Sequence, residues 1–221
     1  MVPLDDRELF DWIAANLYTA VLSDSCDQGG FQNQTFGPEI RPTDESLVMV
    51  GRARTSLWVE VDYVLENPYE GEMLAMDSLQ PGEIAVMATG GSQQIATLGE
   101  LMSTAALKRG ATGAVTDGLI RDVRRIRELK FPVFSAGYRP VDSKGRGVVT
   151  AHQLAVEISG VRIDPGDLVM GDVDGVVVVP RAVERKVLET AWEKVSAENN
   201  TREELERGVL LSEVYAKYGV L

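Results

Sequence analysis

Hydrophobic residues recur at helical spacing near both ends of the chain. In residues 4–24, apolar side chains three and four positions apart share one helical face, and Asp5 and Glu8 have the spacing of a capping box. That stripe consists of Leu9, Phe10, Ile13, Leu17 and Val21. Residues 181–208 carry a second stripe of the same kind. The pattern predicts one helix in each of the two segments.

Between these ends, short apolar runs alternate with segments of helical pattern. Strands are predicted within residues 46–64, 82–88, 111–118, 131–137, 147–158 and 163–180, with an Asp174–Gly175 turn in the last segment. Helices are predicted within 99–110 and 121–130. Because strand and helix alternate in the middle, its strands should be parallel, whereas the flanking strands should be antiparallel. The sequence therefore predicts a mixed α/β domain.

Charge and the scarcity of two residue types restrict the possible functions. The 221 residues include 34 acids and 22 bases, a net charge of -12, which argues against a nucleic-acid binder because phosphate backbones repel an acidic surface. Cys26 is the only cysteine and His152 the only histidine. A disulfide framework and a Cys/His zinc site are thereby excluded, whereas carboxylates remain for a hard cation.

The N-terminal residues lack the basic and then apolar profile of a signal peptide. Apolar runs in the chain also fall short of the length that crosses a bilayer. We therefore expect a cytoplasmic protein without a membrane partner.

Two junctions between a strand and a helix are candidate sites, because ligands of α/β sheets gather beyond the carboxyl ends of parallel strands. At the first, residues 99–102 open a helix, whose unpaired N–H groups favour a carboxylate or phosphate. At the second, Arg121 offers a guanidinium for an anion and Asp122 a carboxylate for a metal. The alternatives are a glycine-tolerant connection that binds water at the first junction, and a helix N-cap formed by Asp122 at the second.

One long stretch resembles a known family. Residues 98–147 contain the loop Gly-Glu-Leu at the start of a helix, then "GATGAVTDGLIRD", then "PVFSAG". This stretch closely resembles the RraA-like family, which includes the class II 4-hydroxy-4-methyl-2-oxoglutarate and 4-carboxy-4-hydroxy-2-oxoadipate aldolases. The likeness extends more weakly to "YTAVLSD" and "PGDLVMGDVDGVVVVP".

The resemblance implies a fold and an assembly. The fold is a layered ββα sandwich of the swivelling phosphohistidine-domain type, with a mixed sheet. The family's subunits form homotrimers or dimers of trimers, and the active site lies at the subunit interface. For this chain we expect a catalytic domain in residues 1–180 and, in 181–221, a C-terminal helical extension that packs on a neighbouring subunit.

The resemblance also implies roles for particular residues. The backbone of Gly99, Glu100, Leu101 and Met102 would hold the carboxylate of the substrate's pyruvoyl part. Arg121 would bind the substrate oxygens and act in catalysis, and Asp122 would anchor one Mg²⁺ or Mn²⁺ ion per site. A catalytic acid from the neighbouring subunit completes the aldolase site. Glu198 is the expected match, with Glu193 as the alternative.

The implied reaction fits these residue types. Cleavage of a 4-hydroxy-2-oxo di- or tricarboxylic acid to pyruvate and a second 2-oxo acid leaves a pyruvate enolate, whose charge a hard cation and Arg121 would stabilise. Oxaloacetate decarboxylation passes through the same enolate and is an expected side activity. The alternative is a non-catalytic regulator that binds ribonuclease E, as some relatives do. Those regulators are shorter and lack the acid that Glu198 would supply.

Overall fold

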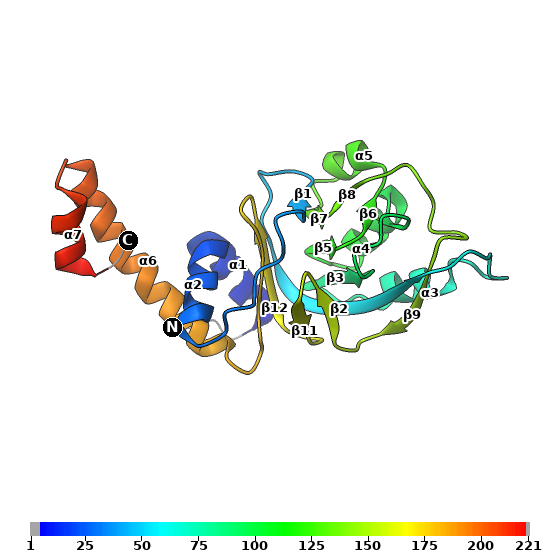
Figure 1. Ribbon diagram of the computed structural model, residues 1–221, viewed down its shortest axis with the longest axis horizontal. Coiled ribbons are helices and arrows are strands. Elements are labelled where there is room, and N and C mark those ends of the chain that lie inside the picture. The colour runs from blue at the N-terminus through cyan, green and yellow to red at the C-terminus, as the bar shows by residue number, and fades with distance from the viewer. Residues whose placement is uncertain (1–4, 220–221) are drawn as a thin grey trace.

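A mixed sheet of eight strands lies at the centre of the computed structural model, which describes residues 5–219 apart from the side chain of Asn200 (Figure 1). Its strands are β1 (Arg41–Pro42), β2 (Met49–Glu60), β3 (Glu83–Ala88), β5 (Gly113–Thr116), β7 (Val133–Ser135), β9 (Gly147–His152), β12 (Leu168–Asp172) and β13 (Gly175–Val179). Strands β2, β3, β5 and β7 run parallel, and the other pairings are antiparallel. The predicted mixed α/β fold is confirmed.

Within residues 5–219, two smaller sheets and seven helices complete the fold. The smaller strands are β4 (Ala96–Leu98), β6 (Leu119–Ile120) and β8 (Gly137–Tyr138), which pair in parallel, and β10 (Val156–Ile158) and β11 (Val161–Ile163), which form a hairpin. The helices are α1 (Asp6–Asn16), α2 (Thr19–Gln28), α3 (Glu70–Asp77), α4 (Glu100–Lys108), α5 (Val123–Glu128), α6 (Glu184–Glu206) and α7 (Leu211–Tyr218).

A single segment connects the two edges of the main sheet and makes it nearly closed. At one edge, Thr35 forms a bridge with Val177 of β13. A few residues later the same segment becomes β1, where Arg41 pairs with Ser135 of β7 at the other edge. The sheet therefore curls into a barrel-like form that encloses a core.

Alternation along the strands divides the apolar side chains among three clusters. Ile84 and Val86 of β3 point into the enclosed core, whereas Ala85 and Met87 face the outer cluster under α3, α4 and α5. Strands β12 and β13 alternate in the same way between the enclosed core and a third cluster under α1, α2 and α6. The closed sheet thus holds α4 and α5 on one outer side and α6 on another.

The first predicted helix is in fact two helices, so that prediction was wrong. Leu17 and Tyr18 adopt extended backbone conformations, and α2 begins at Thr19. The backbone N–H and the hydroxyl of Thr19 donate to the carboxylate of Asp172 at 2.8 and 2.7 Å. The break occurs because a carboxylate from β12 caps the second helix, a long-range contact that local spacing does not reveal.

The strand predicted over residues 147–158 is also interrupted. Gln153 has a φ of 52°, and its backbone N–H donates to the Thr55 carbonyl at 2.9 Å. Its side-chain oxygen accepts from the Thr55 N–H at 3.3 Å. Because Gln153 bonds β2 in this bent conformation, the chain leaves the main sheet after β9 and forms the β10–β11 hairpin.

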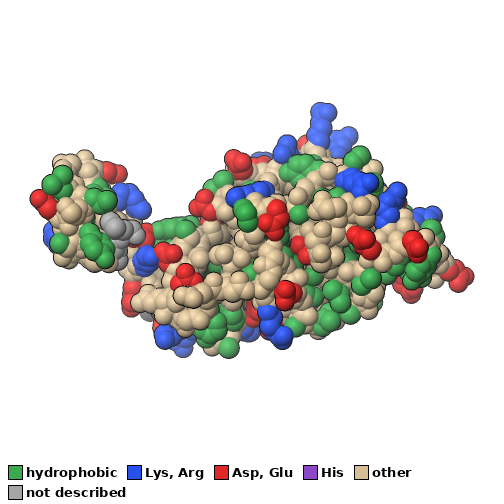
Figure 2. All heavy atoms as spheres, in the orientation of Figure 1, with side chains coloured by type: hydrophobic (Ala, Val, Ile, Leu, Met, Phe, Trp, Pro, Cys, Tyr) green, Lys and Arg blue, Asp and Glu red, His purple; other side chains and the backbone are tan. Residues whose placement is uncertain are grey.

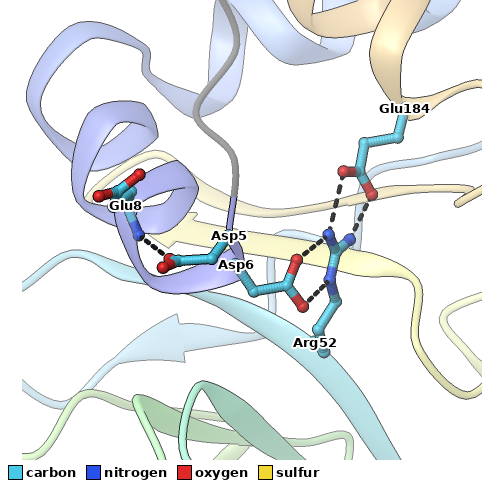
Figure 3. A network of polar contacts seen from close by, with 5 residues as sticks. All are labelled: Asp5, Asp6, Glu8, Arg52 and Glu184. Atoms are coloured by element: carbon cyan, nitrogen blue, oxygen red, sulfur yellow. Dashed lines mark hydrogen bonds and ion pairs between the residues drawn. The ribbon is translucent and has the colours of Figure 1, made fainter.

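Buried Arg52 of β2 ties two helix starts to the sheet (Figure 3). Its guanidinium donates to both carboxylate oxygens of Asp6 at 2.7 and 3.0 Å, and it pairs with Glu184 at the start of α6. Two parallel hydrogen bonds between an arginine and a carboxylate fix the relative orientation of the side chains and also pair their charges. The first residues of α1 and α6 are thereby held side by side at the sheet.

The chain ends in an arm that projects from the body (Figure 1). The last part of α6 extends beyond the main sheet, and α7 packs against α6. Val214 of α7 is buried, and the Tyr218 hydroxyl donates a 2.9 Å hydrogen bond to Glu204 of α6. Hydrophobic side chains are visible on the surface of this arm in Figure 2. Among the described residues, no helix combines the length and the apolar character needed to cross a membrane.

Candidate active site

The two junctions singled out in the sequence lie side by side. Strand β4 leads through Gly99 into α4, and β6 leads through Arg121 and Asp122 into α5. Because β4 and β6 are parallel neighbours, their carboxyl ends meet at one edge. The junctions therefore do meet beyond parallel strands, as expected, but those strands belong to the small β4–β6–β8 sheet. The three short strands of that sheet were not predicted from the sequence.

Gly99 leaves room for both candidate side chains. A Cβ atom at this position would lie 2.7 Å from Oδ2 of Asp122 and 3.2 Å from Cγ and Nε of Arg121. Real Cβ atoms do not approach an oxygen so closely, so a side chain here would push the carboxylate and the guanidinium away. The glycine is required for the close approach of α4 to the Arg121–Asp122 pair.

Asp122 directs its carboxylate toward α4 rather than toward its own helix. Its φ of 58° and ψ of 28° are left-handed, a conformation that aspartate tolerates better than most residues. All of α5 is among the described residues, and none of its N–H groups donates to this carboxylate. Instead Oδ2 accepts a long hydrogen bond of 3.3 Å from the N–H of Glu100. Asp122 is thus not the side-chain N-cap that was the alternative interpretation.

Arg121 is held between two carboxylates. Its backbone N–H donates to the carbonyl of Leu98 at 2.9 Å, which fixes the residue to β4. Its side chain, 40% exposed, lies 3.7 Å from Oδ2 of Asp122 and 3.6 Å from Oδ1 of Asp142. A third contact of 3.4 Å reaches the carbonyl of Val141. Ion pairs this long leave the guanidinium free to bind a further anion.

Apart from the N–H of Glu100, which makes the 3.3 Å hydrogen bond to Asp122, the start of α4 is open to a ligand. Gly99 supplies no side-chain cap, and the first internal bond of the helix runs from the Ser103 N–H to the Gly99 carbonyl at 3.0 Å. Leu101 is 80% exposed at this end. Because the first N–H groups of a helix point outward and its dipole is positive there, residues 99–102 can bind a carboxylate.

A buried carboxylate shapes the loop that precedes this helix. Oxygen Oδ1 of Asp117 accepts from the N–H and the hydroxyl of Thr89 at 2.6 and 2.8 Å, and Oδ2 accepts from the N–H of Gly91 at 2.9 Å. In the sequence, Asp117 is recognisable only as part of the turn after an apolar run. Its structural role is to join the ends of β3 and β5, the strands that precede β4 and β6 along the chain.

Asp142 and Tyr69 are site residues that the sequence analysis missed. The Tyr69 hydroxyl donates to Oδ2 of Asp142 at 2.7 Å. Burial raises the pKa of the Asp142 carboxyl, but the Tyr69 hydrogen bond and the charge of Arg121 outweigh it, so the pKa lies below its ordinary value. Asp142 lies inside the family-like stretch, but no periodic pattern marks residues 139–146. Tyr69 comes from a separate polar loop, and local sequence carries no signal that brings it here.

The carboxylate of Asp122 fits a hard divalent cation. It is 47% exposed, and the missing Cβ of Gly99 opens the space beside Oδ2. Among residues 5–219, His, Cys, Asp and Glu side chains form no group of three that would cage a metal ion. This donor set suits Mg²⁺, which is commonly bound through one or two carboxylates and otherwise by water and substrate oxygens.

Glu198 lies away from this site within one chain. It accepts a hydrogen bond from the Tyr18 hydroxyl of α2. Burial, together with this bond to Glu198, raises the pKa of Tyr18 to about 12. Figure 1 places α6 with α1 and α2, across β12 from α4 and α5. Glu193 is exposed on the same helix. Neither acid meets the Arg121–Asp122 pair within one chain.

Comparison with known proteins shows which family has a similar sequence. The RraA-like model, described as Aldolase/RraA, matches residues 19–178. A Halalkalibacterium halodurans protein named "Putative 4-hydroxy-4-methyl-2-oxoglutarate aldolase" is 35% identical over 185 residues, which cover 84% of this chain and 82% of that protein.

Two solved structures share the fold. An uncharacterised protein from Pseudomonas syringae is 28% identical, with a TM-score of 0.83 over 97% of this chain and 99% of that one. Streptomyces coelicolor RraAS2, described as an unusual member of the RNase ES inhibitor RraA protein family, is 27% identical, with a TM-score of 0.79 over 90% and 99%. The matched segment contains both junctions, and we conclude that this chain belongs to the RraA-like family.

Proposed function

We propose that this chain is a divalent-metal-dependent class II aldolase, a lyase that cleaves a 4-hydroxy-2-oxo di- or tricarboxylic acid to pyruvate and a second 2-oxo acid. The observation that carries the proposal is the placement of Arg121 and Asp122 against the open start of α4, over a glycine whose missing side chain makes the space. The name of the H. halodurans relative supports this reaction class.

Each part of the site has a task in this reaction. The N–H groups at residues 99–102 bind the carboxylate of the pyruvoyl part, and Arg121 binds the neighbouring oxygens. As the bond between C3 and C4 breaks, negative charge develops on the pyruvate enolate, and the guanidinium of Arg121 stabilises it. An Mg²⁺ or Mn²⁺ ion held by Asp122 would supply further polarisation of the 2-oxo group. Oxaloacetate decarboxylation, which yields the same enolate, is proposed as a side activity.

The C4 hydroxyl proton needs an acceptor, and we assign this role to Glu198 of a neighbouring subunit. The projecting arm supports a contact between subunits, because Leu210, Leu211 and Tyr215 are each more than half exposed on it. These side chains lie close together at the start of α7, and contiguous apolar surface of this kind marks interaction sites. We therefore propose a homotrimer or a dimer of trimers, in which residues 181–221 of one subunit reach the catalytic domain, 1–180, of the next. The finer description of that domain as a layered ββα sandwich is part of the same proposal.

A second candidate function is regulation by protein binding. The likeness to RraAS2, described as a relative of an RNase inhibitor, favours it. Against it stands the C-terminal helix with Glu198, because a regulator needs neither an acid there nor an open anion site at α4.

Pyruvate release from several 4-hydroxy-2-oxo acids, measured with and without Mg²⁺, tests the proposal. We expect release that depends on Mg²⁺ and is lost with a chelator. If the purified protein releases no pyruvate from any of these acids in the presence of Mg²⁺ or Mn²⁺, the aldolase proposal is wrong and the regulator remains.

A further inference from the structure

A buried acid lies behind the candidate substrate-binding arginine. Glu72 of α3 is only 5% exposed, although glutamate rarely lies in a protein interior without a partner. Its Oε1 atom has no hydrogen-bond partner among the described residues. The tasks assigned to Arg121, Asp122 and Glu198 do not use it. A buried carboxyl of this kind costs stability and therefore calls for a role.

Contacts connect Glu72 to Arg121 through the segment 141–143. Tyr69, at the start of α3, donates to Oδ2 of Asp142, and the Ser143 hydroxyl donates to Oδ1 of Asp142 at 3.4 Å. Ser143 also lies close enough to the Glu72 carboxyl to lower its pKa. Oδ1 of Asp142 is in turn 3.6 Å from the Arg121 guanidinium. Glu72, Ser143 and Asp142 thus form a chain of polar groups that ends at Arg121.

We propose that Glu72 is a positioning residue for Arg121: its neutral carboxyl supports the 141–143 segment behind the guanidinium, and its ionisation weakens the binding of the anionic substrate. This inference rests on the proposed aldolase function. Arg121 already faces Asp122 and Asp142, and a third negative charge nearby would lower its attraction for another anion.

The surroundings of Glu72 place its titration in the range where the enzyme would work. Burial and the charge of Asp142 raise the pKa of this carboxyl, whereas Ser143 and the charge of Arg121 lower it, and the net result is a pKa of about 7. The charged groups that face it are therefore Asp142 and Arg121, with the Tyr69 phenol beside them.

Other titratable groups come from α4 and β9, the elements with the most contacts to α3. Helix α4 contributes Glu100 and Lys108, and strand β9 contributes His152. Burial and the charge of Arg54 hold the pKa of His152 below its ordinary value. His152 therefore titrates at lower pH than Glu72, and the two can be separated.

The test compares kcat and KM for 4-hydroxy-4-methyl-2-oxoglutarate between pH 5.5 and 8.5, with saturating Mg²⁺. Carboxyl groups of the substrate remain ionised over this range, so the profile reports the protein. For the wild type we expect KM to rise about three- to tenfold with a midpoint near pH 7. For Glu72→Gln, which keeps the shape but cannot ionise, KM should stay near its low-pH value.

Two further variants separate this role from a structural one. Glu70→Gln, a matched control, removes a charge from an exposed position of the same helix and should keep the wild-type profile. Ser143→Ala should move the midpoint to higher pH, because the Ser143 hydroxyl lowers the pKa of Glu72. Melting temperatures show whether each variant folds.

Each outcome bears on the inference separately from the aldolase proposal. If the wild type and Glu72→Gln both release pyruvate with the same dependence of KM on pH, the inference is wrong and the proposed function stands. If Glu72→Gln does not fold, an unshifted midpoint in Ser143→Ala overturns the inference. If the wild type releases no pyruvate at any pH, the proposed function fails, and this inference fails with it.

Discussion

Asp122 combines an unfavourable backbone conformation with an almost unused carboxylate. A left-handed backbone costs a residue other than glycine about 1 kcal/mol. Among the described residues, the Asp122 side chain makes in return one 3.3 Å hydrogen bond and the 3.7 Å ion pair with Arg121. Strain of this kind is often found at functional sites. The conformation directs the carboxylate over Gly99, which is where a metal ligand would be needed beside the start of α4.

Asp122→Asn should therefore separate activity from stability. Asparagine tolerates the same backbone conformation, so we expect the free energy of unfolding to change by less than about 0.5 kcal/mol. Loss of the anionic ligand should lower Mg²⁺-dependent turnover more than about 100-fold, since even indirect supporters of metal ligands matter by 10- to 100-fold. Thermal unfolding measures the change in stability, and turnover at increasing Mg²⁺ concentration measures the loss of metal-dependent activity. Full turnover in the variant would contradict a metal role for Asp122.

Substitutions of Arg121 test whether turnover requires the planar guanidinium or only a positive charge at this position. Lysine keeps the charge but not the planar pair of donors that matches two substrate oxygens. We expect kcat/KM to fall about 100- to 1000-fold in Arg121→Ala, and Arg121→Lys to lie within about tenfold of the alanine variant. Steady-state kinetics on the two variants decide. A lysine variant with near wild-type kinetics would show that Arg121 supplies general positive charge alone.

At the scale of elements, α3 connects stability to pH through Glu72. The pKa of this carboxyl is raised to about 7 in the folded protein from 4.5, so its favourable neutral state is fully present below about pH 4.5. That contribution is lost as pH rises through about 7, by on the order of 3 kcal/mol. The free energy of unfolding of Glu72→Gln, relative to that of the wild type, should therefore be larger at pH 8 than at pH 5. Urea unfolding at both values measures the difference.

The matched control for this effect is Glu70→Gln on the same helix. Its exposed carboxyl should leave the pH dependence of unfolding unchanged. Equal stability differences between Glu72→Gln and the wild type at pH 5 and pH 8 would show that Glu72 ionises normally in the folded protein.

The elements that could be predicted from sequence are those whose apolar pattern is local. The start of α4 after Gly99, the β12–β13 hairpin and the long α6 all follow from spacing and turn residues. The hairpin turn is formed by Val173 and Asp174, one residue before the predicted pair Asp174–Gly175. The break before Thr19 depends on Asp172, and the bend at Gln153 depends on Thr55. Those partners are distant in sequence, so periodicity over a short window does not contain them.

The same limit applies to the site. Arg121, Asp122 and Gly99 were identified because they lie in one motif-bearing stretch, and the structure brings them together. Tyr69 and Glu72 come from a different element and meet Arg121 only through tertiary packing against segment 141–143. Site residues that lie in one sequence motif can be identified from the sequence, whereas the supporting residues that come from other elements cannot.

At the scale of the whole molecule, the chain has its candidate residues in two places. Arg121 and Asp122 lie by α4 and α5, whereas Glu198 lies on α6, on the other side of β12 (Figure 1). One chain does not bring them together, so the account requires a second copy of the chain to complete each site. An oligomer of head-to-tail contacts provides this arrangement.

Mixing two inactive variants tests this central claim most directly. Arg121→Ala lacks the substrate-binding side of its site, and Glu198→Gln lacks the acid that it would give to its neighbour. After equal amounts exchange subunits, about a quarter of the sites should receive an intact Arg121 from one variant and an intact Glu198 from the other. We predict that pyruvate release rises from near zero to about a quarter of the wild-type rate. If exchange is verified by mass and no activity returns, Glu198 does not complete a neighbour's site, and the account of a shared active site is contradicted.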